Sequence, residues 1–238
     1  FINIIDKTGY ASSKDDLKPA LCGVYFNFKD NKITAVATDG HKLVKHEQEV
    51  SEKTTTPLSI VLPLKFLNIV KTITENKEDV VVKIGENHAQ TEQKNFTLIT
   101  RTIKEAFPDF NSVIPDNNKT VAEVNTQEIV DCLKRVSIFS NKTTKQTILS
   151  FSTKGVMLSA QDIETSTSAK EHLDCVFTGD EITTSYNAKY LIEVVQHLGG
   201  KETNIYLNSA LTAAVFQTKE NKEKEKTTSL LMPIRINQ

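Results

Sequence analysis

The sequence has 238 residues, and its 29 Lys and Arg residues nearly balance its 30 Asp and Glu residues, which gives a formal charge of -1. Hydrophobic residues make up 38% and charged residues 25%, which excludes collagen-like, mucin-like and highly charged disordered chains. No apolar run approaches the roughly 20 residues that a membrane-spanning helix needs. The length is that of one large or two ordinary domains.

The first half of the sequence predicts two helices and several short strands. One helix begins at Phe1, and a second follows Pro63, since proline suits the first turn of a helix. The pair Asp30-Asn31 separates two segments of alternating hydrophobicity, which predicts a hairpin. The strands predicted for this half are 24–28, 32–36, 79–84 and 95–102.

The second half predicts the same order of elements, preceded by one more strand. Its first helix is indicated by apolar residues on one face at positions 129, 130, 133, 136 and 138. Its second helix starts after Asn187, a favourable N-cap, and ends at Gly199-Gly200. The strands predicted for this half are 121–124, 148–151, 156–158, 203–207, 212–217 and 228–236.

The two halves are related by an internal repeat. Segment 62–67 matches segment 186–191, which lies 124 residues later, and segment 1–7 matches segment 129–135 at an offset of 128. A polar stretch at 115–120 is the natural joint. Strand runs interleaved with two helices per half indicate an α+β fold. Because the first half lacks a counterpart of strand 121–124, we expect the chain to be a fragment, which the upstream reading frame or an intact mass would test.

Few residues suggest catalysis or metal binding. The three cysteines at 22, 132 and 175 are far apart and lack CxxC spacing, which argues against a disulfide framework or a cysteine zinc site and favours a reducing cytoplasm. His41 and His46 have poor metal-ligand spacing. Asp39 and His41 could act as an acid and a base, but Thr38-Asp39-Gly40 more simply predicts a turn. No cofactor is predicted.

Basic residues recur at matching places in the four predicted helices. By the repeat, Lys7 corresponds to Arg135 and Lys65 corresponds to Lys189. Lys71 lies on the predicted helix of Lys65, and Lys134 lies on that of Arg135. Each helix alone could be an ordinary solvated face, whereas the repetition favours a shared surface for an anionic partner. With a net charge of -1, any contact with nucleic acid should be weak and sensitive to salt.

Three segments together resemble the bacterial sliding clamps, the β subunits of DNA polymerase III. They are Ala-Thr-Asp-Gly-His-Lys-Leu at 37–43, Phe-Pro-Asp-Phe at 107–110 followed by Val-Ile-Pro at 113–115, and Leu-Leu-Met-Pro-Ile-Arg at 230–235. The resemblance implies the DNA-clamp fold, with two helices per domain packed on antiparallel sheets. It implies that 1–117 is the middle domain without its first strand and that 118–238 is the C-terminal domain.

The resemblance also implies a function and partners. Family members are head-to-tail homodimers when full length, and their ring encircles duplex DNA without reading its sequence. They tether the catalytic subunit of DNA polymerase III and also bind the clamp loader and repair proteins. By this likeness we expect the residues nearest DNA to be Lys7, Lys65, Lys71, Lys134, Arg135 and Lys189.

The family binds linear peptides of its partners in a hydrophobic pocket between the middle and last domains. Leu230, Leu231 and Met232 also suit an edge strand, and both interpretations can hold together. Three positions depart from the family's common residues, namely Lys42, Ser112 and Thr144. Carried over by motif, the pocket walls would be Leu21, Thr38, Gly40, His41, Lys42, Leu43, Pro108 and Val113, with Asn187, Tyr190, Leu211, Ala213, Leu230, Leu231, Met232, Pro233, Ile234 and Arg235 from the last domain.

Two classes of function therefore stand against each other. The favoured one is a non-enzymatic, cytoplasmic processivity factor that binds peptides. The rival is a nucleotidyltransferase, whose chemistry needs metal-binding carboxylates at an active site. The sequence contains no convincing carboxylate cluster. A polymerase label would then describe only the DNA polymerase III holoenzyme.

Overall fold

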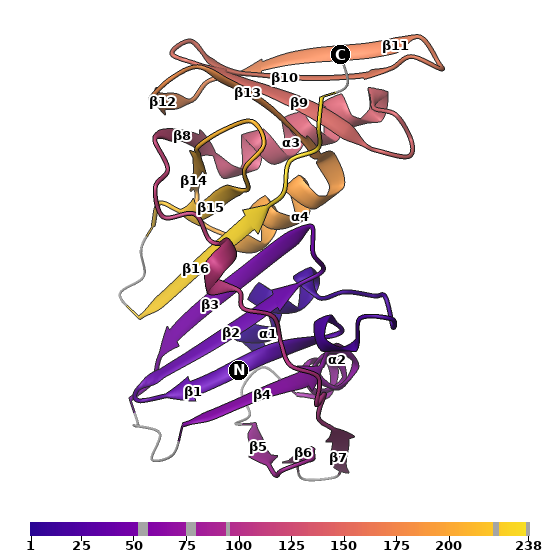
Figure 1. Cartoon of the computed structure of the whole chain (residues 1–238), viewed down its shortest axis with the longest axis vertical. Helices are drawn as coiled ribbons and strands as arrows, with labels where there is room; N and C mark the ends of the chain where they lie inside the picture. Colours follow the sequence, from indigo (N-terminus) through magenta and orange to yellow (C-terminus); the bar gives the residue numbers. More distant parts are fainter. Residues whose placement is uncertain (52–56, 75–79, 94–95, 221–223, 237–238) are drawn as a thin grey trace. The chain divides into compact units, whose positions relative to one another are not determined.

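The computed structural model describes residues 1–51, 57–74, 80–93, 96–220 and 224–236 (Figure 1). The chain divides into two compact units. Unit 1 comprises Phe1–Phe110 with Lys222–Thr227, and unit 2 comprises Asn111–Asn221 with Thr228–Gln238. The last strand, β16 (Glu225–Leu231), therefore contributes its first residues to unit 1 and its remaining residues to unit 2.

The main sheet of unit 1 is antiparallel. The predicted hairpin forms, and Asp30 in its turn has a φ of 56°, the left-handed conformation that Asp and Asn tolerate. Glu49 at the sheet's outer strand donates its amide to the carbonyl of Lys224 at 2.8 Å, so the C-terminal segment of unit 1 lies beside that strand. The strands, in spatial order, are β3 (Lys42–Glu49), β2 (Lys32–Thr38), β1 (Gly23–Lys29) and β4 (Leu58–Pro63).

Two helices pack against this sheet, α1 (Ile2–Thr8) and α2 (Leu64–Ile73). Phe66, Leu67 and Val70 form the buried stripe of α2, as the periodicity predicts. Pro63 occupies the N-cap position of α2, one residue earlier than the predicted first turn. Short 3-10 helices follow α1 at Gly9–Ala11 and precede β1 at Pro19–Leu21.

A smaller antiparallel sheet completes unit 1. Its strands, in order, are β5 (Val81–Ile84), β6 (His88–Gln93) and β7 (Phe96–Arg101). Residues 79 and 95, the predicted starts of two strands, lie outside the described residues. The sequence did not predict β6 because its polar residues show no hydrophobic alternation.

Unit 2 contains two antiparallel sheets with two helices between them. Helix α3 (Thr126–Val136) contacts strands of both sheets, and so does α4 (Ala188–Leu198). One sheet consists of β12 (Val176–Thr178), β8 (Thr120–Asn125), β14 (Glu202–Leu207), β15 (Ala214–Thr218) and the end of β16. The other consists of β11 (Thr167–Leu173), β10 (Gly155–Asp162), β9 (Gln146–Ser152) and β13 (Ile182–Asn187).

The caps of the unit 2 helices follow the sequence closely. Asn187 accepts hydrogen bonds from the amides of Lys189 and Tyr190, and the helix ends at Gly199, whose φ is 72°. Asn125 caps α3 in the same way. The predicted extension of α3 to Ile138 is wrong, because the chain tightens into a 3-10 turn at Ser137–Phe139 and leaves Ile138 exposed. A further 3-10 turn lies at Asn111–Val113.

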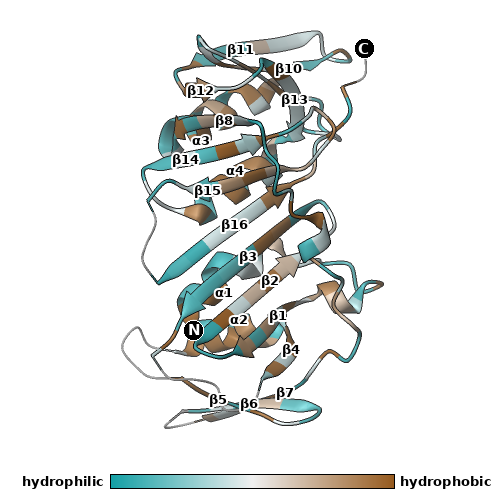
Figure 2. Ribbon diagram, turned by 60° about the vertical axis from the view of Figure 1, so that its left-hand side comes forward, coloured by the Kyte–Doolittle hydropathy of each residue, from teal (hydrophilic) through white to brown (hydrophobic). Residues whose placement is uncertain are grey.

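The predicted last strand is displaced along the sequence. Strand β16 runs from Glu225 to Leu231, whereas the prediction was 228–236. It changes from hydrophilic at its start to hydrophobic at its end, so its first residues do not read as a strand (Figure 2). It ends before Pro233, which has no amide to donate to a sheet. Among the described residues, no helix is long and apolar enough to cross a membrane.

Candidate functional site

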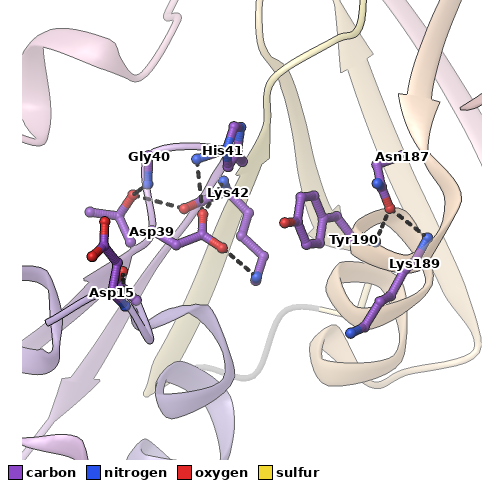
Figure 3. Close-up of polar contacts among 10 residues, drawn as sticks. Asp15, Asp39, Gly40, His41, Lys42, Asn187, Lys189 and Tyr190 are labelled. Atoms are coloured by element: carbon purple, nitrogen blue, oxygen red, sulfur yellow. Dashed lines mark hydrogen bonds and ion pairs between the residues drawn. The ribbon is translucent and has the colours of Figure 1, made fainter. Parts of the chain in front are cut away.

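The predicted turn at Thr38–Gly40 in unit 1 is confirmed, and polar side chains close it (Figure 3). One carboxylate oxygen of Asp39 accepts hydrogen bonds from the amides of His41 and Lys42, both at 2.9 Å. Thr38 Oγ1 accepts from the amide of Gly40 at 3.1 Å and donates to the carbonyl of Lys42 at 2.8 Å. Gly40 has a φ of 91°, which favours glycine. The turn therefore holds His41 in a fixed, exposed position.

Lys42 is a buried cation rather than a surface lysine. Its side chain is 5% exposed, and Nζ lies 2.6 Å from Asp39 Oδ2. A buried charge has to be paired, so Asp39 both shapes the turn and neutralises Lys42. Leu43, the next residue, is buried at the start of β3.

An aromatic cluster positions the segment that contains Pro108. Phe107 stacks on Tyr25 of β1 with ring centroids 5.3 Å apart, and Phe110 lies 5.8 Å from the same ring. Pro108 is exposed between the two phenylalanines. Tyr25 was not among the predicted site residues, although the two Phe residues of the Phe-Pro-Asp-Phe motif indicate that an apolar surface receives them. Leu21, at the end of a 3-10 helix in the same unit, is half-buried.

In unit 2, the tail after β16 is held by hydrogen bonds although it is not a strand. The amide of Ile234 donates to the carbonyl of Ser185 at 2.8 Å, and Ser185 Oγ donates to the carbonyl of Ile234 at 2.7 Å. Gln146 Nε2 donates to the carbonyl of Arg235 at 3.1 Å. These contacts fix Pro233, Ile234 and Arg235 against β13 and β9. Ser185 and Gln146 were not predicted as site residues, because their partners are distant in the sequence.

Apolar residues of the predicted unit 2 set separate into a buried and an exposed group. Leu230, Leu231 and Ala213 are buried, so they form part of the unit 2 core. Met232 is 49% exposed and Leu211 is 66% exposed. Val113 is exposed as well. The exposed group could contact an apolar partner without opening the core.

The first turn of α4 displays Lys189 and Tyr190 (Figure 3). The Asn187 side chain fixes this turn with both of its polar atoms. Its Oδ1 caps the helix, and its Nδ2 donates to the backbone carbonyl of Thr144 at 3.0 Å. Only the backbone of Thr144 is used in this contact, so a residue with any side chain could make it.

The six predicted DNA-facing residues lie on four helices, as expected. Lys7 is on α1, Lys65 and Lys71 are on α2, Lys134 and Arg135 are on α3, and Lys189 is on α4. All except the half-buried Lys7 are exposed.

Carboxylates pair with three of these cations. Lys71 pairs with Asp6, and Lys134 Nζ lies 3.9 Å from Asp131. Arg135 forms a two-pronged pair with Glu171, in which Nε donates at 3.1 Å. The Arg135 hydrogen bond lowers the pKa of Glu171 and raises the pKa of Arg135 itself. Within the described residues, Lys65 and Lys189 form no ion pair, so these two repeat-related lysines carry the least compensated charge.

Among the described residues, no three His, Cys, Asp or Glu side chains are grouped so that they could hold a metal ion. The predicted site residues thus remain in two sets. One set lies in unit 1 and includes the Asp39 turn, and the other lies in unit 2 and includes the tail and α4.

Two family models match the chain. The DNA polymerase III beta subunit, central domain, matches residues 1–109, and the DNA polymerase III beta subunit, C-terminal domain, matches residues 111–235. The chain is 27% identical to the beta sliding clamp of Haemophilus influenzae and 26% identical to that of Bacillus subtilis. These matches cover 98% of this chain but 63% and 62% of the two relatives.

Solved structures show the same fold. The DNA polymerase sliding clamp of Pseudomonas aeruginosa has a TM-score of 0.92 at 22% identity, over 99% of this chain and 63% of that chain. The clamp of Bacillus subtilis has a TM-score of 0.93 at 23% identity, over 99% of this chain and 62% of that chain. The predicted α+β DNA-clamp fold is therefore confirmed. Since the two family models together match nearly all of its residues, the chain belongs to the family of DNA polymerase III beta subunits.

Proposed function

We propose that this chain acts as part of a sliding clamp, the processivity factor that encircles duplex DNA and tethers the replicative polymerase in bacterial replication. The observation that carries the proposal is the match of both halves to the two family models, supported by the fold shared with solved clamps. The chain spans 63% and 62% of the lengths of the two relatives. The homodimeric ring is accordingly proposed for the full-length protein.

The exposed basic residues on α2, α3 and α4, with the half-buried Lys7 on α1, support contact with DNA through phosphates alone. Such contacts carry no sequence information, and few of them give weak, salt-sensitive binding. The ion pairs of Lys71, Lys134 and Arg135 weaken the positive field further. Weak attraction suits a protein that holds DNA by enclosure and has to slide along it.

The second part of the proposal is peptide binding. We infer that the unit 1 set and the unit 2 set both contribute to the binding of linear peptides from the polymerase catalytic subunit, the clamp loader and repair proteins. Exposed Met232 and Leu211 offer apolar contacts, while fixed backbone at the Asp39 turn and the Ile234 tail offers defined polar groups. A cytoplasmic location follows from this function and is proposed with it.

The test of the proposed peptide site is the substitution Met232→Ala. We expect it to weaken binding of a synthetic peptide with one leucine and one phenylalanine anchor by at least about tenfold, since truncating a central apolar contact typically costs about 1–2 kcal/mol or more. Isothermal calorimetry measures the affinity. The fold should be intact because Met232 lies beyond β16 and is half exposed.

Ile163→Ala is the matched control, because Ile163 is an exposed apolar residue of unit 2 in the turn between β10 and β11. It should leave the affinity unchanged. An equal affinity of the wild type and Met232→Ala would refute the peptide site. A truncation after Leu231 is a companion variant, because it removes Met232 and keeps the buried Leu230 and Leu231.

The rival function, template-directed nucleotidyl transfer, makes the opposite prediction in a primer-extension assay. We expect the isolated chain to incorporate no nucleotide in the presence of Mg²⁺. Metal-dependent incorporation that copurifies with the chain would overturn the non-enzymatic proposal.

A further inference from the structure

Two of the predicted DNA-facing cations are hydrogen-bonded to carboxylates that come from neighbouring elements. In unit 1, Lys71 Nζ of α2 donates to Asp6 Oδ1 of α1. In unit 2, Arg135 of α3 donates from two of its nitrogens to the two carboxylate oxygens of Glu171 in β11. Hydrogen bonds between two charged groups are about twice as strong as those between neutral groups. Each carboxylate therefore fixes the position of its cation.

Glu171 is itself held in place from several sides. It lies within β11, where it is paired with Leu158 of β10. The buried thiol of Cys132, one turn before Arg135 on α3, also donates to its carboxylate. The hydrogen bond from Arg135 lowers the pKa of Glu171, so this carboxylate is charged at neutral pH. Both prongs of the guanidinium are thus occupied, and a fork of the same kind is what an arginine offers to a phosphate.

The internal repeat does not account for these two contacts. At the offset of 128 residues, Asp6 corresponds to Lys134, so the two units hold a cation through residues that are not equivalent. The other cations are not held in this way. Lys134 Nζ lies 3.9 Å from Asp131, beyond hydrogen-bonding distance. Within the described residues, Lys65 and Lys189 form no ion pair.

The two held pairs are open to water. The side chains of Lys71 and Asp6 are 47% and 44% exposed, and those of Arg135 and Glu171 are 60% and 32% exposed. Exposed ion pairs contribute little to stability, because water screens the charges and the side chains lose conformational freedom. The fold therefore does not depend on these contacts. A phosphate that approaches either cation has to displace the carboxylate.

We propose that Asp6 and Glu171 are positioning residues that hold Lys71 and Arg135 away from phosphates and so keep the affinity for duplex DNA low. This inference rests on the DNA contact proposed above and adds that carboxylates regulate it. Each phosphate contact that a cation makes has to break before the protein can move along DNA. A cation that is already bonded to the protein offers less resistance to that movement than a free one.

The test removes one carboxylate at a time from the complete chain and measures duplex binding by fluorescence anisotropy over a range of salt concentrations. We expect Asp6→Asn and Glu171→Gln each to bind at least about threefold more tightly at low salt. The slope of log affinity against log salt should become steeper by about 0.9 in each variant, because one released cation adds one phosphate contact. Asp30→Asn is the matched control. It makes the same change in net charge in the exposed turn between β1 and β2, where asparagine tolerates the φ of 56°, and it should leave the slope unchanged.

A double-mutant comparison shows whether each carboxylate acts through its cation. The gain from Asp6→Asn should disappear when Lys71→Gln is already present, and the gain from Glu171→Gln should disappear when Arg135→Gln is present. Gains that persist in these backgrounds, or an equal gain in Asp30→Asn, would show that only net charge matters and would overturn the proposal. If Glu171→Gln does not fold, the comparison of Asp6 with Lys71 decides.

The same measurements separate this inference from the proposed function. Weaker binding of the combined variant Lys65→Gln and Lys189→Gln, together with carboxylate variants that show no gain, would overturn the inference alone. A chain whose binding to the duplex does not depend on salt in any of the variants would overturn both this inference and the proposed DNA contact.

Discussion

Single polar side chains fix the backbone at two places where candidate residues leave regular structure. Asp39 closes the turn before β3 by accepting hydrogen bonds from two backbone amides. Ser185 forms two hydrogen bonds with the backbone of Ile234. In both places a side chain supplies at least one hydrogen bond that a sheet would otherwise supply. The neighbouring His41 and Met232 are thereby exposed on backbone that is held in place.

Tyr186 of β13 is a buried group whose ionisation should destabilise the fold. Burial raises the pKa of Tyr186 from the ordinary 10.0 to about 12. In the unfolded chain this phenol loses its proton near pH 10, whereas in the folded chain it keeps it. Stability is therefore undiminished below about pH 10 and falls as the pH rises toward 12, by about 1.4 kcal/mol at pH 11 from this group.

We expect Tyr186→Phe to remove this part of the alkaline loss. The measurement is the free energy of unfolding in urea for both proteins between pH 8 and pH 11. Other groups titrate in the same range in both proteins, so the difference between the two curves isolates Tyr186. Parallel curves would contradict the assignment of the raised pKa to burial.

At the scale of elements, the two helices of unit 2 differ in how firmly their starts are attached. Asn125 caps α3 through its side-chain oxygen Oδ1. Asn187 caps α4 in the same way and also ties it to the carbonyl of Thr144. The start of α4 is thus linked to the loop before β9, which orients Lys189 and Tyr190.

We expect Asn187→Ala to cost more stability than Asn125→Ala. Loss of a cap typically costs about 1 kcal/mol, and loss of one further hydrogen bond adds about 1 kcal/mol. Urea unfolding of the two variants provides the comparison, with Asn125→Ala as the matched control. Equal costs would mean that the bond to Thr144 contributes nothing.

The sequence predicts some elements better than others. The difference depends on whether the residues that determine an element lie within it or far away in the sequence. Helices α2, α3 and α4 carry apolar stripes, and Asn125 and Asn187 cap the last two, so local patterns suffice. Strand β3 was not predicted because its outward positions carry charged residues instead of alternating with apolar ones in a clear pattern. Two of these residues, Lys45 and Glu47, are two positions apart and form an ion pair at 3.3 Å. The Ile234 tail depends on Ser185, 49 residues away, and no local pattern indicates such a contact.

At the scale of the whole molecule, the repeat distributes positive charge over four helices while the net charge stays near zero. The sequence predicted this placement, because equivalent residues recur at fixed offsets. It could not predict that Asp6, Asp131 and Glu171 would pair with three of the cations, since two of these pairs join different elements. The family resemblance, rather than any spacing, supplied the pocket residues.

The unpaired lysines should dominate contact with DNA. We expect Lys65→Gln combined with Lys189→Gln to reduce binding of a duplex at low salt and to lower the slope of log affinity against log salt by about 1–2. Lys14→Gln combined with Lys154→Gln removes the same charge outside the helices and serves as control. Fluorescence anisotropy measures both, and an equal loss in the two double variants would show that only net charge matters.

Unit 1 cannot complete its main sheet until nearly the whole chain has been synthesised. Thr227, which belongs to unit 1, contacts the ring of buried His46 at 2.8 Å across 181 positions of sequence. A ribosome that adds about 5–20 residues per second needs about 10–35 s to cover that distance. Throughout this interval the edge of β3 has no partner strand. The charged residues Lys45, Glu47 and Glu49 protect this edge, because charged side chains on an edge strand disfavour pairing with other nascent chains.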